Sequence, residues 1–290
     1  MRRSSRSRCD TSSNVRVAVV WPLQPPYRER SLTLKTFVYT FESPATLAVA
    51  HRLVGTGKIA GVILQRPLTH ADKLRLVRRR LARYGAPRVF NELLFHVYYS
   101  LFLKRSDDRL RRTLALPEAT RDTLAAAVEL FDVDSLNGPA GRALIDRLRP
   151  DLVVMMAREM VQPAVRAIPR LGFIGCHPGI LPDYRGVYAP FWAMRDGRRD
   201  KVGLTVYLAD DGVDTGPLIA ERRLSPRFGL RHFKVECDRL LIEGAQDLID
   251  VIEKAEHGAL TTYTKPDAAN HLFSHVGLTH FVEALVRCSR

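Results

Sequence analysis

Segments typical of strands and helices alternate along this chain of 290 residues, and this alternation limits its fold more than any other feature. An apolar, β-branched run at 15–20 is followed by a helix-like segment at 44–54 and an apolar strand at 59–65. The second half repeats the order. It does so with a helix at 139–148, a strand at 151–156, a short helix at 163–168 and a strand at 172–176. Strands that alternate with helices predict an α/β fold with a doubly wound, mainly parallel sheet.

Two polar residues follow apolar strands at places where such a sheet binds ligands, beyond the carboxyl ends of its strands. His177 comes directly after the strand at 172–176, and Asp214 lies in the loop after the apolar run 204–208. If both strands belong to one sheet, we expect the two loops to lie at the same edge. A His–Asp pair can orient an imidazole for proton transfer near neutral pH. Spacing alone does not separate this role from an ordinary structural one.

The positive charge of the chain is local. The formal net charge is +14, but residues 66–112 alone hold 13 basic and four acidic residues, and residues 1–16 hold five arginines and one aspartate. Residues 113–290 hold 22 basic and 24 acidic residues. Charge alone would suggest nucleic-acid binding, but this distribution disfavours it as the role of the main domain.

The composition divides the chain into four parts. We expect a disordered basic tail at 1–14, an α/β domain at 15–224, a helical insertion at about 68–116 within it, and a helical extension at 225–290 with helices at 231–257 and 278–287. The aromatic helix of the insertion has an apolar core of 11 residues at 93–103, too short to span a membrane. The insertion is open to two interpretations: a helical pair that packs on the sheet, or a surface that also contacts lipid headgroups or phosphates.

The four cysteines show neither CxxC nor metal-ligand spacing. We therefore expect no disulfide framework and no metal site, and a reducing, cytoplasmic location. No apolar run is long enough to span a bilayer, and the tail lacks the apolar stretch of a secretion signal.

Two motifs carry a resemblance. His-Pro-Gly-Ile-Leu-Pro-Asp-Tyr-Arg-Gly at 177–186 and Asp-Gly-Val-Asp-Thr-Gly-Pro at 211–217 resemble the catalytic domain of the folate-dependent formyltransferases. This family transfers a formyl group from 10-formyltetrahydrofolate to a primary amine, on a Rossmann-like sheet. The resemblance implies that His177 is the acid and oxyanion partner, and that Asp214 positions the histidine and manages the proton of the amine.

The resemblance also implies a place for the folate co-substrate. In the family, backbone groups of two loops hold the pterin ring, and these loops match 158–161 and 209–213 of this chain. The expected binding residues are Arg158, Met160, Val161, Asp210, Asp211 and Val213.

One position departs from the family pattern. The asparagine expected two residues before the histidine is Gly175 here, and the loss of an oxyanion donor costs a factor of about 10² to 10³ in rate. Three explanations stay open: a water or an amide from elsewhere replaces the carboxamide, Cys176 or a more distant side chain adapts the site to a related one-carbon reaction, or the protein is weak or inactive. Cys176 itself reads as a buried apolar residue.

The acceptor is inferred from what the sequence lacks. Residues 21–26 are not the glycine-rich phosphate loop of glycinamide ribonucleotide formyltransferases, and the helical residues after 225 do not resemble the C-terminal β-barrel of methionyl-tRNA formyltransferases. We therefore expect an amino sugar, linked to a nucleotide, as the acceptor. A phosphate-bearing or surface-bound acceptor would suit the basic 66–112 segment. A catalytically weak binding protein and a glycinamide ribonucleotide-type enzyme are the alternatives, and a homodimer is open.

Overall fold

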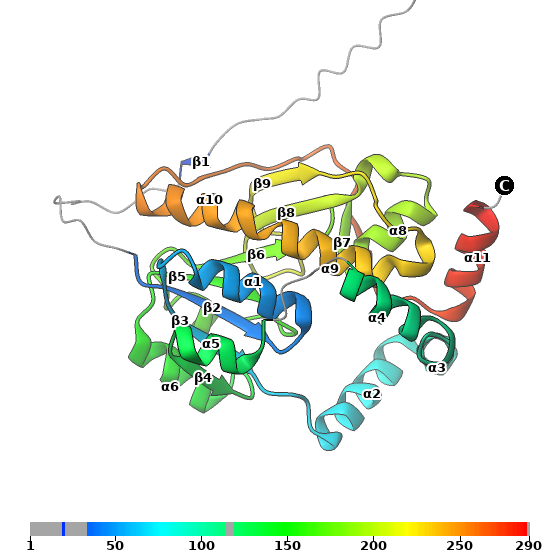
Figure 1. Ribbon diagram of the computed structural model, residues 1–290, viewed down its shortest axis with the longest axis horizontal. Coiled ribbons are helices and arrows are strands. Elements are labelled where there is room, and N and C mark those ends of the chain that lie inside the picture. The colour runs from blue at the N-terminus through cyan, green and yellow to red at the C-terminus, as the bar shows by residue number, and fades with distance from the viewer. Residues whose placement is uncertain (1–18, 21–33, 114–118, 289–290) are drawn as a thin grey trace, which may run out of the picture.

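A seven-stranded sheet forms the centre of the computed structural model, which describes residues 19–20, 34–113 and 119–288 (Figure 1). The strand order is β4-β3-β2-β5-β6-β8-β9; the first five strands are parallel, and β8 runs antiparallel to β6 and β9. The strands are β2 (Thr36–Phe41), β3 (Ile59–Gln65), β4 (Leu130–Val133), β5 (Leu152–Met156), β6 (Phe173–His177), β8 (Gly203–Leu208) and β9 (Leu218–Arg223). The expected doubly wound, mainly parallel α/β fold is confirmed.

The first strand of the sheet is β2, so the prediction that residues 15–20 take this place was wrong. β2 reads TFVYTF, and its first five residues are buried between β3 and β5. It leads within two residues into α1 (Pro44–Val54), whose N-cap Ser43 accepts a hydrogen bond from the Thr46 N–H at 3.2 Å. The short strand β1 (Val19–Val20) pairs antiparallel with β10 (Thr261–Thr262), outside the central sheet. Residues 15–18 and the loop 21–26 lie outside the described part of the chain.

Helices cover both faces of the sheet, because alternate residues of each buried strand point to opposite sides. On β2, Val38 faces the core beneath α1, while Phe37 and Tyr39 face the core beneath α6. The helices of the first face are α1, α5 (Arg121–Ala127), α9 (Phe233–Glu243) and α10 (Ala245–Glu256). Those of the second face are α6 (Pro139–Leu148) and α7 (Pro163–Arg166).

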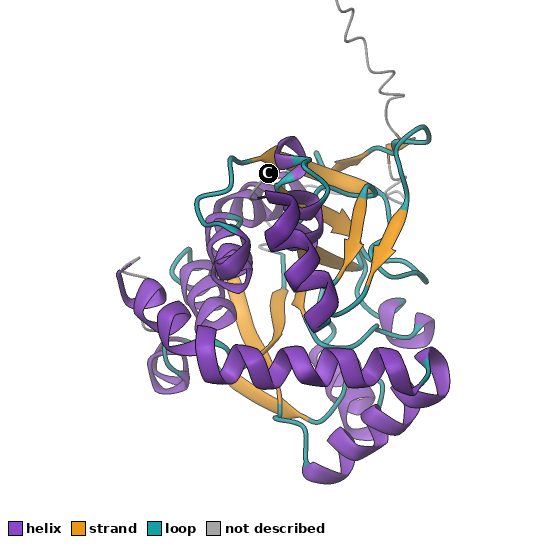
Figure 2. Ribbon diagram, turned by 90° about the vertical axis from the view of Figure 1, so that its right-hand side faces the viewer, coloured by secondary structure: helices purple, strands orange, loops and turns teal. Residues whose placement is uncertain are grey.

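The helical insertion lies at one end of the molecule. It consists of α2 (His70–Tyr84), α3 (Ala86–Tyr98), the π-helical turn η1 (Tyr99–Leu103) and α4 (Lys104–Thr113). The last three are contiguous in sequence and form one long helix (Figure 2). We call α2, α3 and η1, residues 70–103, the arm. The buried side of α3 packs against α11 (Leu278–Cys288) and α8 (Ala189–Arg195), not against the sheet, and α2 has no buried residue.

The residues after 225 are integrated into the α/β core. The helix expected at 231–257 is divided at Gly244 into α9 and α10, which follow the 3₁₀ turn η3 (Leu230–His232). Both helices join the core of the sheet through residues such as Leu248 and Ile252. Between α10 and α11 the chain adds β10 and β11 (His271–Phe273), and β11 pairs in parallel with β7 (Tyr184–Gly186). A second 3₁₀ turn, η2 (Arg199–Lys201), precedes β8.

Among the described helices, none is both long enough and apolar enough to cross a membrane. Within the same residues, no cluster of three or more histidine, cysteine or acidic side chains could hold a metal ion.

Candidate active site

His177 and Asp214 meet, but not by the route that the sequence suggested. β6 and β8 are antiparallel, with Gly175 opposite Tyr207, so their carboxyl ends point in opposite directions. The expectation that both loops leave the sheet at one edge was therefore wrong. Asp214 reaches the histidine because its loop runs beside β7: the Gly186 N–H donates to Asp214 Oδ2 at 2.9 Å. Asp214 itself adopts a left-handed backbone conformation with φ of 53°.

The histidine and the carboxylate are both held in place. His177 Nδ1 lies 3.6 Å from Asp214 Oδ2, and the two side chains are only 6% and 15% exposed. His177 Nε2 lies 2.8 Å from the carbonyl oxygen of Tyr184, which can only accept, so Nε2 carries the proton of this bond. Nδ1 is then the ring nitrogen that can exchange a proton near Asp214. This arrangement is suited to general acid–base chemistry.

Tyr207 completes the pair, and the sequence reading missed it. Its hydroxyl donates to Asp214 Oδ1 at 2.6 Å. Burial, followed by the nearby Asp214 charge, raises the pKa of Tyr207 well above its usual value, so the phenol stays protonated. A Cβ atom built on Gly175 would lie 2.6 Å from the Tyr207 ring, so the ring occupies the space where a side chain at 175 would project. Because side chains alternate along β8, Tyr207 lies on the same face of the sheet as Thr205. This alternation is the sequence signal that could have identified Tyr207 as a residue of the site.

Cys176 takes no part in this arrangement. It lies between Gly175 and His177 on β6 and therefore faces the opposite core, beside Val206. Burial raises the pKa of its thiol to about 12. A thiol in this state is a packing residue and not a nucleophile, which supports the sequence interpretation and leaves no basis for Cys176 reshaping the site.

The two loops expected to hold the pterin ring lie side by side, and Arg166 of α7 joins them. Its guanidinium donates to the carbonyl oxygens of Val161 at 3.2 Å and of Asp210 at 2.7 Å, and it pairs with Asp211 at 2.5 Å. Arg185 donates to the carbonyl oxygen of Val213 at 3.0 Å, which ties the second loop to β7. Neither arginine was singled out from the sequence.

The other expected binding residues occupy different environments. Arg158 stacks its guanidinium 3.9 Å from the centre of the Phe41 ring, and burial lowers its pKa. Met160 is 48% exposed. The Asp210 carboxylate accepts from the Gly212 N–H at 3.0 Å and thus shapes its own loop. The side chains of Asp210 and Asp211 thus stabilise their own loop, whereas that of Met160 faces solvent.

Glu159 links the first loop, residues 158–161, to β2 and to the residues that follow β4. Its carboxylate accepts hydrogen bonds from the hydroxyls of Tyr39 and Ser135, from the Leu136 N–H at 2.8 Å and from Asn137 Nδ2 at 3.2 Å. Burial, together with the neighbouring carboxylate, raises the pKa of Tyr39 above its usual value. Four donors on one partly buried carboxylate fix the course of the chain between β5 and α7.

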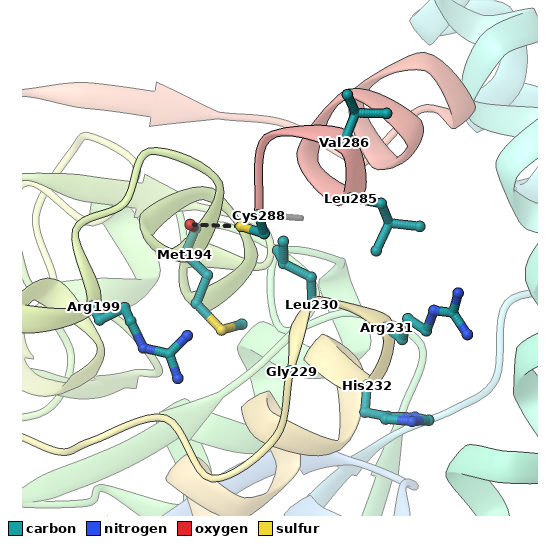
Figure 3. A pocket seen from close by; sticks show the side chains of 9 residues that line it. All are labelled: Met194, Arg199, Gly229, Leu230, Arg231, His232, Leu285, Val286 and Cys288. Atoms are coloured by element: carbon teal, nitrogen blue, oxygen red, sulfur yellow. Dashed lines mark hydrogen bonds between the residues drawn. The ribbon is translucent and has the colours of Figure 1, made fainter. Parts of the chain in front are cut away.

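Two cavities lie away from this site. A cavity of about 600 Å³ opens between η3, α8 and α11, and its walls include Arg199, Arg231 and Cys288 (Figure 3). A second one, of about 460 Å³, is bounded by Arg88, Trp192 and residues of β11. Neither cavity is lined by His177, Asp214 or Tyr207.

Known structures share this fold. Glycinamide ribonucleotide transformylase 1 from Symbiobacterium toebii superposes with a TM-score of 0.51 at 18% identity, over 81% of this chain and 92% of that one. A sugar N-formyltransferase from Shewanella sp FDAARGOS_354 superposes with a TM-score of 0.51 at 11% identity, over 87% of each chain. At these identities the likeness defines the class of fold, a formyltransferase-type Rossmann-like sheet.

Sequence comparison finds a similarity over part of the chain. Residues 106–225 match the family model described as formyl transferase. The methionyl-tRNA formyltransferase of Roseiflexus sp. is 30% identical over 192 residues, which make up 64% of this chain and 58% of that protein. Residues 106–225 are thus similar to the formyl transferase family, and the resemblance seen in the motifs is confirmed for this part of the chain. The chain spans between 38% and 58% of the length of the curated relatives it matches.

Proposed function

We propose that this protein transfers a formyl group from 10-formyltetrahydrofolate to a primary amine, and that the acceptor is an amino sugar linked to a nucleotide. The observation that carries the proposal is the His177–Asp214 pair. Two residues from separate motifs of the family lie 3.6 Å apart, buried, and each with its own hydrogen-bond partners.

The reaction forms a bond between the amine nitrogen and the formyl carbon, and it breaks the bond between that carbon and N10 of the folate. The amine loses one proton, and the folate nitrogen gains one as it leaves. Asp214 takes the amine proton and passes it to His177 Nδ1, which gives it to the leaving folate nitrogen, so both side chains end as they began. The Tyr184 carbonyl keeps the imidazole from turning, so proton transfer needs no search for orientation.

The loops at 158–161 and 209–213 are the proposed binding place of the folate. Support comes from their environment: Arg166 and Glu159 fix both loops through their own side chains. Backbone N–H and C=O groups at the rim are then presented in a fixed pattern, which suits the donors and acceptors of a flat heterocycle.

Two observations support the choice of acceptor. The connection after β2 is residues 42–43 and holds no glycine, so the phosphate loop of a glycinamide ribonucleotide enzyme has no counterpart there. Residues 21–26 precede β2, the first strand of the sheet, so their lack of a glycine-rich loop does not bear on the acceptor. In addition, the chain after residue 225 forms the helices α9 and α10, which pack on the sheet. In this part of the chain we expected a methionyl-tRNA enzyme to have a β-barrel.

The test is a formyl-transfer assay with the full chain. Release of tetrahydrofolate from 10-formyltetrahydrofolate is followed with three acceptors: an amino sugar linked to a nucleotide, glycinamide ribonucleotide and methionyl-tRNA. Turnover that depends on the amino sugar supports the proposal, and preferential turnover of either other acceptor replaces it with that function.

A weak or inactive protein is the second candidate, and Gly175 is the observation that favours it, since the expected oxyanion donor is absent from that position. Binding of folate without turnover of any of the three acceptors would favour this candidate.

A further inference from the structure

Gly175 and Tyr207 share one volume across two paired strands. They are direct cross-strand partners in the antiparallel ladder of β6 and β8. A Cβ atom at 175 would lie 2.6 Å from ring carbons of Tyr207 and 2.8 Å from its hydroxyl oxygen, closer than real Cβ contacts come. Glycine is therefore the residue that lets this tyrosine lie flat over β6.

The hydroxyl at the end of that ring has a specific partner. Tyr207 is 8% exposed and donates its single proton to Asp214 Oδ1 at 2.6 Å. The Gly186 N–H holds the other carboxylate oxygen, Oδ2, on the side that faces His177. The two donors together fix the plane of the carboxylate.

From this geometry we propose that Tyr207 is a positioning residue that orients the Asp214 carboxylate toward His177, and that Gly175 is present to make room for it. The inference rests on the proposed function. Because the phenol has one proton and Asp214 accepts it, Tyr207 acts through the carboxylate and not on the formyl oxygen. Gly175 and Tyr207 therefore act together: the glycine not only lacks the carboxamide of the family's asparagine but also makes room for the tyrosine.

Unfolding experiments test the shared volume without any assay of activity. Gly175→Ala should lower the melting temperature by about 5 °C in the natural background, because it overpacks a buried strand. In the Tyr207→Ala background the same change should lower it much less. Equal losses in both backgrounds would overturn the idea that the two residues compete for space.

Kinetics test the positioning role. Tyr207→Phe keeps the ring and removes the donor, so kcat should fall about tenfold while the KM for 10-formyltetrahydrofolate stays within about twofold. A carboxylate that loses a donated hydrogen bond is easier to protonate, so the acidic limb of the kcat profile should move to higher pH. Tyr263→Phe is the matched control, since Tyr263 packs against the same buried cluster.

An unchanged kcat and pH profile in Tyr207→Phe would refute the positioning role. A natural protein that transfers no formyl group to any acceptor would instead refute the proposed function, and the melting comparison then decides on the Gly175–Tyr207 pair by itself.

A different observation concerns the arm: α3 is apolar on two opposite sides. Phe95, Tyr99 and Leu103 are buried in the core beside α8 and α11. On the opposite side of α3, apolar side chains that are 39% to 67% exposed recur every three or four residues and form a stripe. A similar stripe lies on α2. The exposed residues of the stripe are Phe90, Leu94, Val97 and Leu101 on α3 and η1, and Leu74, Val77 and Leu81 on α2. Leu76, Leu93 and Phe102 are also exposed but lie beside the stripes.

The segment that carries this apolar face is rich in positive charge. The 66–112 segment has nine more basic than acidic residues, and its four acidic side chains are all engaged. Asp72 pairs with Arg75, Glu92 with Arg80, Asp108 with Arg111 and Lys104, and Asp107 with His232. The net positive charge of α2 and α4 therefore comes from arginine and lysine residues that outnumber the acidic ones.

We infer that the arm docks on the surface of an anionic lipid bilayer. Exposed apolar residues bordered by arginines are the pattern of helices that lie in a membrane interface. A second copy of this chain fits less well, because a symmetric dimer would bring two strongly positive faces together. Since α2 buries no residue in the protein, its apolar side chains contribute little to the fold itself. This proposal is independent of the Gly175–Tyr207 pair.

Vesicle sedimentation tests the docking surface. The full chain should bind vesicles of phosphatidylglycerol and phosphatidylcholine, and bind pure phosphatidylcholine at least tenfold more weakly. Leu101→Glu/Phe102→Glu should weaken binding to the anionic vesicles by more than about tenfold, because both side chains would leave the interface. Val282→Glu on α11 is the control, since Val282 is 51% exposed and lies outside the arm.

Other outcomes overturn the inference. Equal binding to neutral and anionic vesicles removes the charge argument, and the absence of binding removes the proposal. A dimer in sedimentation velocity that the same double variant dissociates would assign the face to a second copy of the chain.

Discussion

The strands around His177 and the arm use their side chains in opposite ways. At the site, polar groups are buried and each has a partner from another element: Tyr184, Gly186 and Tyr207 hold the His–Asp pair. On the arm, apolar groups are exposed, and many basic residues lie between them in the sequence. Long-range hydrogen bonds satisfy the polar groups of the first region within the chain, whereas the second leaves its apolar groups exposed, which is why we propose an outside surface for it.

The largest effect is expected where the arm meets the core. Phe95 is 3% exposed and packs against Phe233 and Phe281, with ring centres 5.9 and 5.1 Å apart. Phe95→Ala should lower the free energy of unfolding by about 3 to 5 kcal/mol, measured by urea denaturation. A loss below about 1 kcal/mol would mean that α3 is not part of the folded core.

Substitutions at the site should lower the rate of formyl transfer without unfolding the protein. His177→Ala and Asp214→Ala should each lower formyl transfer by at least about 100-fold, measured as tetrahydrofolate release at saturating substrates. Binding to anionic vesicles should stay unchanged in both variants. Near-normal turnover in either one would remove that residue from the mechanism.

A smaller effect is expected at the junction of the two loops. Arg166→Ala removes the contacts to Val161, Asp210 and Asp211, so the KM for 10-formyltetrahydrofolate should rise about tenfold while kcat changes less than about threefold. The control is Arg170→Ala, which also breaks an arginine–carboxylate pair, with Asp151. If both variants raised KM alike, the loops would not owe their order to Arg166.

The smallest effect separates the two sides of one helix. Leu101 is 67% exposed, so Leu101→Ala should change the free energy of unfolding by less than about 0.5 kcal/mol, in contrast to Phe95→Ala. The measurement is again urea denaturation. A large loss would show that the exposed stripe is packed within the protein after all.

Much of the fold could be predicted because it rests on local patterns. The helix at 139–148 and the strand at 59–65 have the bounds that the sequence suggested, since proline, glycine and apolar periodicity mark their ends. The first strand could not be chosen correctly in this way. The sequence analysis read 15–20 as the first strand and did not single out Thr36–Phe41, which is identified by its pairing with β3 and β5.

The site was predictable in its two motif residues and not in their supports. His177 and Asp214 stand in recognisable motifs, but the argument for their meeting assumed parallel strands. Tyr207, Arg166 and Glu159 matter through contacts 7, 44 and 120 residues away in the sequence, to Asp214, Asp210 and Tyr39. Such contacts depend on strand order and register, which single-residue patterns do not contain.

The cross-strand pairing of Gly175 with Tyr207 restricts how this site can change during evolution. An asparagine at 175 collides with the ring, and a small residue at 207 beside glycine leaves a cavity, so each single step passes through a poor intermediate. The order of substitutions is therefore constrained: space must open at 207 before a side chain can return at 175. Among relatives, the two positions should vary together, with the glycine–tyrosine and asparagine–small-residue combinations as separate lineages.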